Sequence, residues 1–210
     1  DNLNTAVGYN AGTSLTTGVK NTLIGGLAGD SLTTGSENVA IGYAALITED
    51  AHGKNVAIGK SALTAQNAGA DAYNVAVGFE AGKAVTTGIQ NTIIGSLAGD
   101  ALTTGVSNTV LGYGALSTED TGGRAIAIGY KALLTQNYDG NSYNVAIGYE
   151  AGKAITTGVQ NTLIGGLAGD TITTGANNVA VGYDTLSAID SGARNTAVGY
   201  QALKTLNVGG

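Results

Sequence analysis

The sequence predicts an all-β protein, a parallel β-solenoid (β-roll) of twelve coils that assembles as an intertwined or side-by-side homotrimer. A short motif ending in glycine recurs at near-constant intervals along the whole chain, which is typical of stacked coils. The motif is rich in β-branched residues and bounded by glycine, which favours strands. Glycine makes up 35 of the 210 residues, and because an interior glycine costs a helix about 1 kcal/mol relative to alanine, helices are disfavoured.

One glycine in each coil, here called the key glycine, defines the repeat. The key glycines are Gly8, Gly25, Gly42, Gly59, Gly78, Gly95, Gly112, Gly129, Gly148, Gly165, Gly182 and Gly199. Their spacing runs 17, 17, 17 and then 19, so the larger repeat is a block of four coils: 4–73, 74–143 and a slightly shorter 144–210. We therefore expect residues 1–210 to form one repetitive shaft without linkers, as a segment of a longer fibre.

The four residues ending at the key glycine, as in 5–8 and 39–42, predict one short strand per coil. Three residues after the key glycine comes alanine in eleven coils, for example Ala98, which predicts a position where nothing larger packs. Ten residues after the key glycine a second glycine follows in ten coils, as at Gly18 and Gly35, and predicts a turn with positive φ.

The position four residues after the key glycine reads Gly, Gly, Leu, Leu through each block, as at Gly12, Gly29, Leu46 and Leu63. Where it is glycine, an aliphatic residue such as Leu15 follows three positions later. Where it is leucine, that later position is usually polar. The pattern predicts one buried aliphatic side chain that alternates between two places.

Stacking places like residues above one another at about 4.8 Å, so a column of asparagines is expected to form a chain of amide hydrogen bonds. The residue four before the key glycine is asparagine in eleven coils, with Ala125 as the exception. This asparagine ladder consists of Asn4, Asn21, Asn38, Asn55, Asn74, Asn91, Asn108, Asn144, Asn161, Asn178 and Asn195. The same alignment places Lys83 above Asp100 and Lys153 above Asp170, which predicts ion pairs worth about 0.2 kcal/mol or slightly more.

The trimer is predicted from the supply of apolar residues. Each coil has one apolar strand and one half-apolar, alanine-containing segment, which is too little to enclose a core comfortably. We therefore expect three chains to bury their alanine and valine faces against a common axis.

Units reading Asn-Thr-Ala-Val-Gly-Tyr-x-Ala-Leu, repeated once per coil and often ending in Thr-Thr-Gly, resemble tail-fibre-type repeat proteins of phages and bacterial surfaces. The core Asn-Val-Ala-Ile-Gly at 38–42, 55–59 and 144–148 is also similar to the head domains of trimeric autotransporter adhesins, whose shorter repeats build a left-handed β-roll trimer. The resemblance covers all twelve coils. It implies a structural fibre shaft that supports attachment to a host or surface, located outside the cell on a virion tail fibre or a bacterial cell surface.

Composition disfavours several other classes of function. The net charge of −6 provides no basic stripe for nucleic acid, and no apolar stretch approaches the roughly 20 residues of a membrane span. Without cysteine, and with His52 as the single histidine, we expect no enzymatic activity, no cofactor and no multi-histidine metal site. His52 is interpreted as a solvated turn residue. The recurring aspartates, such as Asp30 and Asp50, are interpreted as exposed charges rather than calcium ligands.

Two rival functions follow from side-chain columns. One is direct binding of glycan or matrix by the aromatic column, which consists of Tyr9, Tyr43, Phe79, Tyr113, Tyr130, Tyr149, Tyr183 and Tyr200, although such a column more often packs between coils. The other is ice binding by the Thr-Thr-Gly triplets, which Asp50 and Asn67 interrupt in the first block. The two-residue insertions predict longer, solvent-facing turns, so Tyr73, Tyr138 and Tyr143 are candidate contacts with a host-surface glycan or protein.

Overall fold

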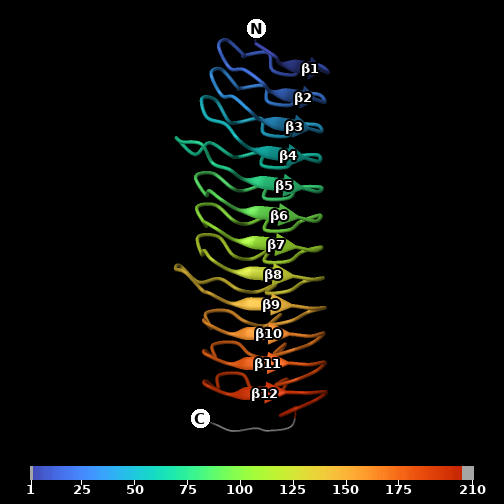
Figure 1. Cartoon of the computed structure of the whole chain (residues 1–210), viewed down its shortest axis with the longest axis vertical. Coiled ribbons are helices and arrows are strands. Elements are labelled where there is room, and N and C mark those ends of the chain that lie inside the picture. Colours follow the sequence, from blue (N-terminus) through green and yellow to red (C-terminus); the bar gives the residue numbers. More distant parts are fainter. Residues whose placement is uncertain (1, 205–210) are drawn as a thin grey trace.

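The computed structural model describes residues 2–204, which form one twelve-stranded parallel sheet running the length of the molecule (Figure 1). Each coil contributes one three-residue strand: β1 Thr5–Val7, β2 Thr22–Ile24, β3 Val39–Ile41, β4 Val56–Ile58, β5 Val75–Val77, β6 Thr92–Ile94, β7 Thr109–Leu111, β8 Ile126–Ile128, β9 Val145–Ile147, β10 Thr162–Ile164, β11 Val179–Val181 and β12 Thr196–Val198. The strands lie in chain order, and each pairs with its neighbours in sequence. The predicted all-β solenoid is confirmed.

Hydrogen bonds join successive coils well beyond the strands. The Gly25 N–H donates to the Val7 carbonyl at 2.8 Å, and the Leu27 N–H donates to the Tyr9 carbonyl at the same distance. The two insertions lengthen the turns between β4 and β5 and between β8 and β9, which project beyond the other turns (Figure 1). The register of the ladder is kept across them, with Val56 opposite Val75. Within residues 2–204, no helix has the length and apolar character needed to cross a membrane.

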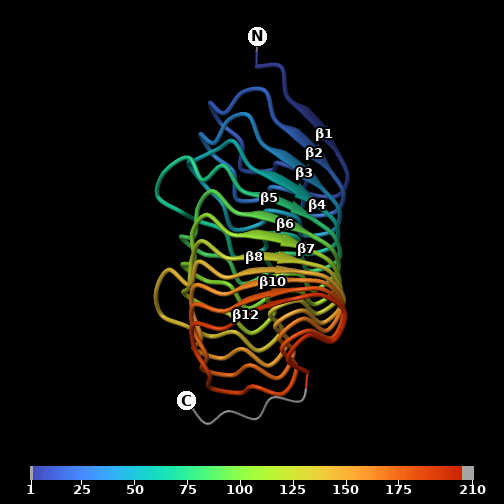
Figure 2. The same ribbon diagram turned by 60° about the horizontal axis from the view of Figure 1, so that its bottom comes forward.

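The interior of the solenoid is closed by one chain. Seen from nearer its end, the molecule is a stack of flattened loops (Figure 2). The middle residue of each strand from β2 to β12 points inward, and side chains such as Leu23, Ala28 and Leu32 are fully buried without any partner chain. The expectation that a coil cannot enclose its own core is therefore wrong.

The interior is filled because a large side chain at one position of a coil is matched by a small residue at a neighbouring position. A Cβ added to Gly29 would lie 2.8 Å from side-chain carbons of both Leu23 and Leu32, so glycine there leaves room for both leucines. In the third and fourth coils of the first block the strand contributes only alanine, and Leu46 or Leu63 fills the space instead. The predicted alternation of a buried aliphatic is confirmed. In the structure, the central residue of the strand is a third position that can hold the buried aliphatic side chain.

The first and third residues of each strand point away from the interior, because successive side chains on a strand face opposite sides. We call the surface formed by the third residues the outer face; they are Val7, Ile24, Ile41, Ile58, Val77, Ile94, Leu111, Ile128, Ile147, Ile164, Val181 and Val198. All twelve are aliphatic and none is buried. The exposed fraction is 43% at Leu111 and 58% at Val7. The alanines thus lie inside each chain, while five of the twelve outward aliphatic residues are exposed and the other seven are half-buried.

The predicted positive φ is borne out at Gly69 (φ 70°), Gly209 lies outside the described residues, and the other turn glycines have a different cause. The key glycines adopt φ between 122° and 144°, whereas Gly18 and Gly35 are not among the positive-φ residues. A Cβ at Gly18 would lie 2.3 Å from the Gly35 carbonyl oxygen, so close approach of the next coil is what excludes a side chain. The coils turn instead at non-glycine residues in the left-handed region, such as Lys20 (φ 60°) and Leu46 (φ 51°).

Candidate functional site

The asparagine ladder is a series of hydrogen bonds along one side of the solenoid. In each step the side-chain oxygen of one asparagine accepts the backbone N–H of the next, as Asn4 Oδ1 does from Asn21 at 2.8 Å. The side-chain amide then donates to a carbonyl 14 residues on, as Asn21 Nδ2 does to Gly35 at 2.9 Å. From Asn21 to Asn178 the ladder is buried. Except for Asn55, whose Nδ2 has no partner, each asparagine from Asn4 to Asn178 therefore satisfies backbone groups of two neighbouring coils.

Ala125 interrupts the ladder, and a different residue compensates for it. In the first block, Asn55 Oδ1 accepts the Asn74 N–H at 3.2 Å. In the second block, where alanine replaces that asparagine, the Asn144 N–H approaches Ser142 Oγ at 3.5 Å. The first block has Ala72 at the position of Ser142. The serine hydroxyl thus replaces the missing amide oxygen.

Four polar side chains inside the solenoid were not anticipated as buried. Glu49, Gln66, Glu119 and Gln136 occupy the slot that holds an aliphatic residue in other coils, and all are fully buried. Glu119 and Gln136 are joined by a 3.0 Å hydrogen bond between Gln136 Nε2 and Glu119 Oε2. Gln66 and Gln136 each accept from a ladder asparagine, at 2.7 and 2.8 Å. The signal available in the sequence was the polar residue at an aliphatic position.

The aromatic column lies at the surface of the solenoid, and its residues are exposed. Exposure runs from 40% at Tyr130 to 78% at Tyr9. Within the column the rings stack on one another, with centroids 5.6 Å apart for Tyr113 and Tyr130 and 5.3 Å apart for Tyr130 and Tyr149. Lys131 Nζ lies 5.1 Å from the Tyr130 centroid. Rings of neighbouring coils thus pack on one another where they stack, as the packing interpretation expects, while 40% or more of each residue in the column remains exposed.

Tyr73, Tyr138 and Tyr143 are 52%, 37% and 48% exposed. Tyr73 and Tyr143 occupy equivalent positions just before a ladder asparagine, and each is covered by a cation, Lys54 at 5.2 Å and Arg124 at 5.6 Å from the ring centroid. Tyr138 belongs to the inserted turn of the second block, where the first block has alanine. The three tyrosines therefore present two different surroundings.

The predicted ion pairs between coils do not form. Lys83 Nζ pairs with Glu80 at 2.9 Å, three residues earlier in its own turn, and Lys153 pairs with Glu150 in the same way at 3.0 Å. Asp100 Oδ1 and Asp170 Oδ1 are enclosed without a hydrogen-bond partner. Burial raises the pKa of both aspartates. Their interpretation as freely exposed charges is therefore wrong.

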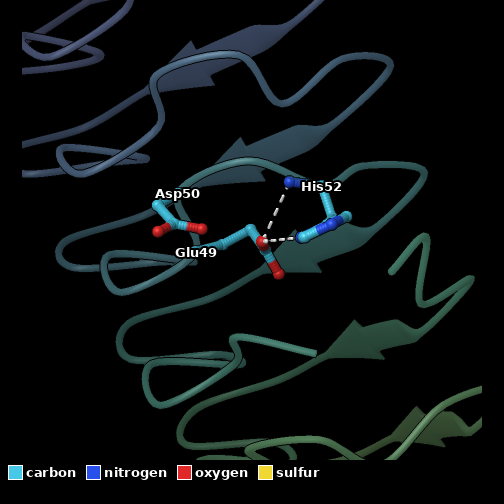
Figure 3. Close-up of side chains that lie close together, drawn as sticks. All are labelled: Glu49, Asp50 and His52. Atoms are coloured by element: carbon cyan, nitrogen blue, oxygen red, sulfur yellow. Dashed lines mark hydrogen bonds and ion pairs between the residues drawn. The ribbon is translucent and has the colours of Figure 1, made fainter. Parts of the chain in front are cut away.

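His52 also differs from its interpretation as a solvated turn residue. Its side chain is 30% exposed, and Nδ1 is enclosed and lies 3.7 Å from Glu49 Oε1. Glu49, Asp50 and His52 each offer one ligand atom, and these atoms lie within 4.8 Å of one another (Figure 3). Among the described residues, this is the one group of histidine and acidic side chains with such geometry.

No pocket opens on the surface between residues 2 and 204. Comparisons of the chain with protein-family models, with curated proteins and with solved structures gave no match.

Proposed function

We propose that this chain is the shaft of a homotrimeric extracellular fibre, of the kind found in virion tail fibres and cell-surface adhesins. The observation that supports this most is the outer face, a column of twelve aliphatic side chains on a sheet of constant register. Twelve coils at about 4.8 Å extend this column over roughly 53 Å between its first and last strand. Apolar surfaces of such length mark protein–protein contacts.

A second and third copy of this chain are the occupants that match the outer face. Its aliphatic residues recur once per coil, so only a partner with the same repeat can match it along the whole length. Strands β2 to β11 are already paired on both edges within one chain. Copies must therefore meet through side chains, which favours a side-by-side trimer over an intertwined one. The exposed aromatic column lies two residues further along the chain in eight of the twelve coils.

The proposal is tested by the mass of the particle in solution. Light scattering should give the mass of three chains of 20.6 kDa each. A variant carrying Ile58→Lys, Ile94→Lys and Ile128→Lys places three charges on the outer face and should dissociate to single chains. Because these side chains point outward, the circular dichroism of the coils should be retained.

The matched control carries the same three charges on another exposed surface. Thr17, Thr87 and Thr157 are exposed in the first coil of each block, and changing all three to lysine should leave the trimer mass unchanged. Dissociation of both variants would indicate a general effect of charge. A parent chain that scatters with the mass of a monomer would overturn the trimer.

The exposed, stacked tyrosines favour direct glycan binding as a second candidate function. Tyrosine faces pack against the apolar faces of sugar rings, and Tyr113, Tyr130 and Tyr149 remain 40 to 55% exposed although they stack on one another. Changing these three residues to serine should abolish retention on immobilised polysaccharide if the column binds sugars. The corresponding change of Tyr73, Tyr138 and Tyr143 tests the turns. Unchanged retention in both variants would leave the shaft role alone.

A further inference from the structure

The turn after β3 contains the only histidine of the chain beside two carboxylates. Figure 3 shows the Glu49 carboxylate lying between the side chains of Asp50 and His52. Glu49 is fully buried, Asp50 is exposed and His52 is partly buried. The group therefore begins inside the solenoid and reaches the surface within four residues.

Two atoms of this group have no hydrogen-bond partner although they are enclosed. Glu49 Oε1 accepts the backbone N–H of His52 at 3.1 Å, whereas Glu49 Oε2 is unpaired. His52 Nδ1 is unpaired as well. An enclosed polar atom without a partner costs about 1–3 kcal/mol, so such atoms are rare unless something binds them.

The second block provides an internal comparison in which the same position is satisfied. Glu119 Oε1 accepts the Gly122 N–H at 2.8 Å. Glu119 Oε2 accepts Gln136 Nε2 at 3.0 Å and the Tyr138 N–H at 3.2 Å. Gly122 stands where the first block has His52. The block without histidine thus completes the hydrogen bonds of its glutamate.

In the first block the corresponding glutamine is used elsewhere. Gln66 Nε2 donates to the Thr86 carbonyl at 3.1 Å and does not reach Glu49. The third block has Ile189 at the position of the glutamate, so no buried carboxylate needs a hydrogen-bond partner there. The open carboxylate oxygen and the histidine therefore occur together, in one coil.

We propose that Glu49, Asp50 and His52 bind a divalent transition-metal ion of the Zn²⁺ class. Imidazole nitrogen with carboxylate oxygen is a donor set for zinc, whereas calcium and magnesium take oxygen ligands. Zinc bonds of about 2.0–2.1 Å in tetrahedral geometry place donors about 3.3 Å apart. The 3.7 Å between His52 Nδ1 and Glu49 Oε1, the oxygen that also accepts the His52 backbone N–H, is close to this value. Water completes the coordination on the exposed side of Asp50.

Calorimetric titration of the whole chain, free of tag histidines, with Zn²⁺ at neutral pH tests the proposal. We expect one ion per chain, together with a higher melting temperature in Zn²⁺ than in chelator. Because His52 is the single histidine, its imidazole NMR signals should shift on titration. Unchanged imidazole signals during saturable binding would place the ion elsewhere and overturn the site.

Two variants and one control separate metal binding from a structural role. His52→Gly reproduces the residue of the second block and should weaken binding more than about tenfold, as should Glu49→Gln. Glu119→Gln changes the equivalent, satisfied glutamate and should leave Zn²⁺ binding unchanged. Retained affinity in a folded His52→Gly variant would refute the site, as would an equal loss in Glu119→Gln.

Discussion

Removing the side chain of Asn91 is the sharpest test of how the coils are held together. Its Oδ1 accepts the Asn108 N–H at 2.9 Å, and its Nδ2 donates to the Gly105 carbonyl at 2.9 Å. Asn91→Ala leaves both backbone groups buried without a partner. At about 1–3 kcal/mol for each group, the free energy of unfolding should fall by about 2–6 kcal/mol.

The first block supplies a graded comparison. Asn55 offers only one such bond, from Oδ1 to the Asn74 N–H at 3.2 Å, and its own Nδ2 is buried without a partner. Asn55→Ala therefore leaves one backbone donor unpaired and at the same time removes an unpaired amide. The cost should be about 1 kcal/mol, at most half of that for Asn91→Ala.

The second block also shows how this smaller loss can be repaired. Ala72→Ser introduces the hydroxyl that Ser142 supplies beside Ala125. In the Asn55→Ala background it should recover half or more of the lost stability, whereas Ala72→Ser alone should change stability little. The four proteins form a double-mutant cycle with an interaction energy of about 0.5–1.5 kcal/mol.

Stability is measured by denaturant unfolding followed by circular dichroism, at one chain concentration because assembly shifts the midpoint. Hydrogen exchange of the Asn74 and Asn108 amides reports the affected bonds directly. Equal costs for Asn55→Ala and Asn91→Ala would refute the reasoning. So would an Ala72→Ser change that fails to protect the Asn74 amide.

Three further predictions follow from packing, stacking and charge. Ala98→Phe should destabilise the fold by about 1–3 kcal/mol in denaturant unfolding, because Ala98 is fully buried in a filled interior; full tolerance would contradict that packing. Deleting 74–143 keeps the coil order, so the particle should shorten by roughly 19 Å in small-angle scattering, with little change in stability per coil; a misfolded deletion would contradict the stacking. Burial disfavours the ionised carboxyl groups of Asp100 and Asp170 and so raises their pKa above the ordinary value of 3.8. Their favourable contribution to the free energy of unfolding is therefore fully present below pH 3.8 and is lost as the pH rises through the raised pKa. Changing both to asparagine should therefore stabilise the chain at neutral pH, with a gain that shrinks toward pH 4; a gain that grows as pH falls would contradict this sign.

Periodicity alone determined the stacking of this protein. The key glycines and the β-branched tetrads located all twelve strands, because coils of equal length place each tetrad above the last. The asparagine column was visible for the same reason. A residue that recurs at one position in nearly every coil meets its own copies, which predicts contact between successive asparagines, whereas the bonds from their side chains to backbone groups were decided by the tertiary structure.

The conformation within one coil was decided only in three dimensions. Gly18 recurs like a positive-φ turn residue, yet the carbonyl of Gly35 in the next coil is what excludes its Cβ. Repetition shows that a glycine is required and cannot distinguish these two causes. Leu46 takes a left-handed conformation that its residue type does not indicate, and this conformation directs a leucine inward to close the core.

The candidate metal site shows the same division. The sequence places Glu49, Asp50 and His52 in one turn, but a histidine that occurs once carries no periodic signal. The importance of His52 depends on the hydrogen bonds of two glutamine side chains. Gln136 donates its amide N–H to Glu119, whereas Gln66 donates to a backbone carbonyl and leaves Glu49 without this partner. Hydrogen-bond partners are chosen by the orientation of side chains in a closed interior, and only the tertiary structure defines that orientation.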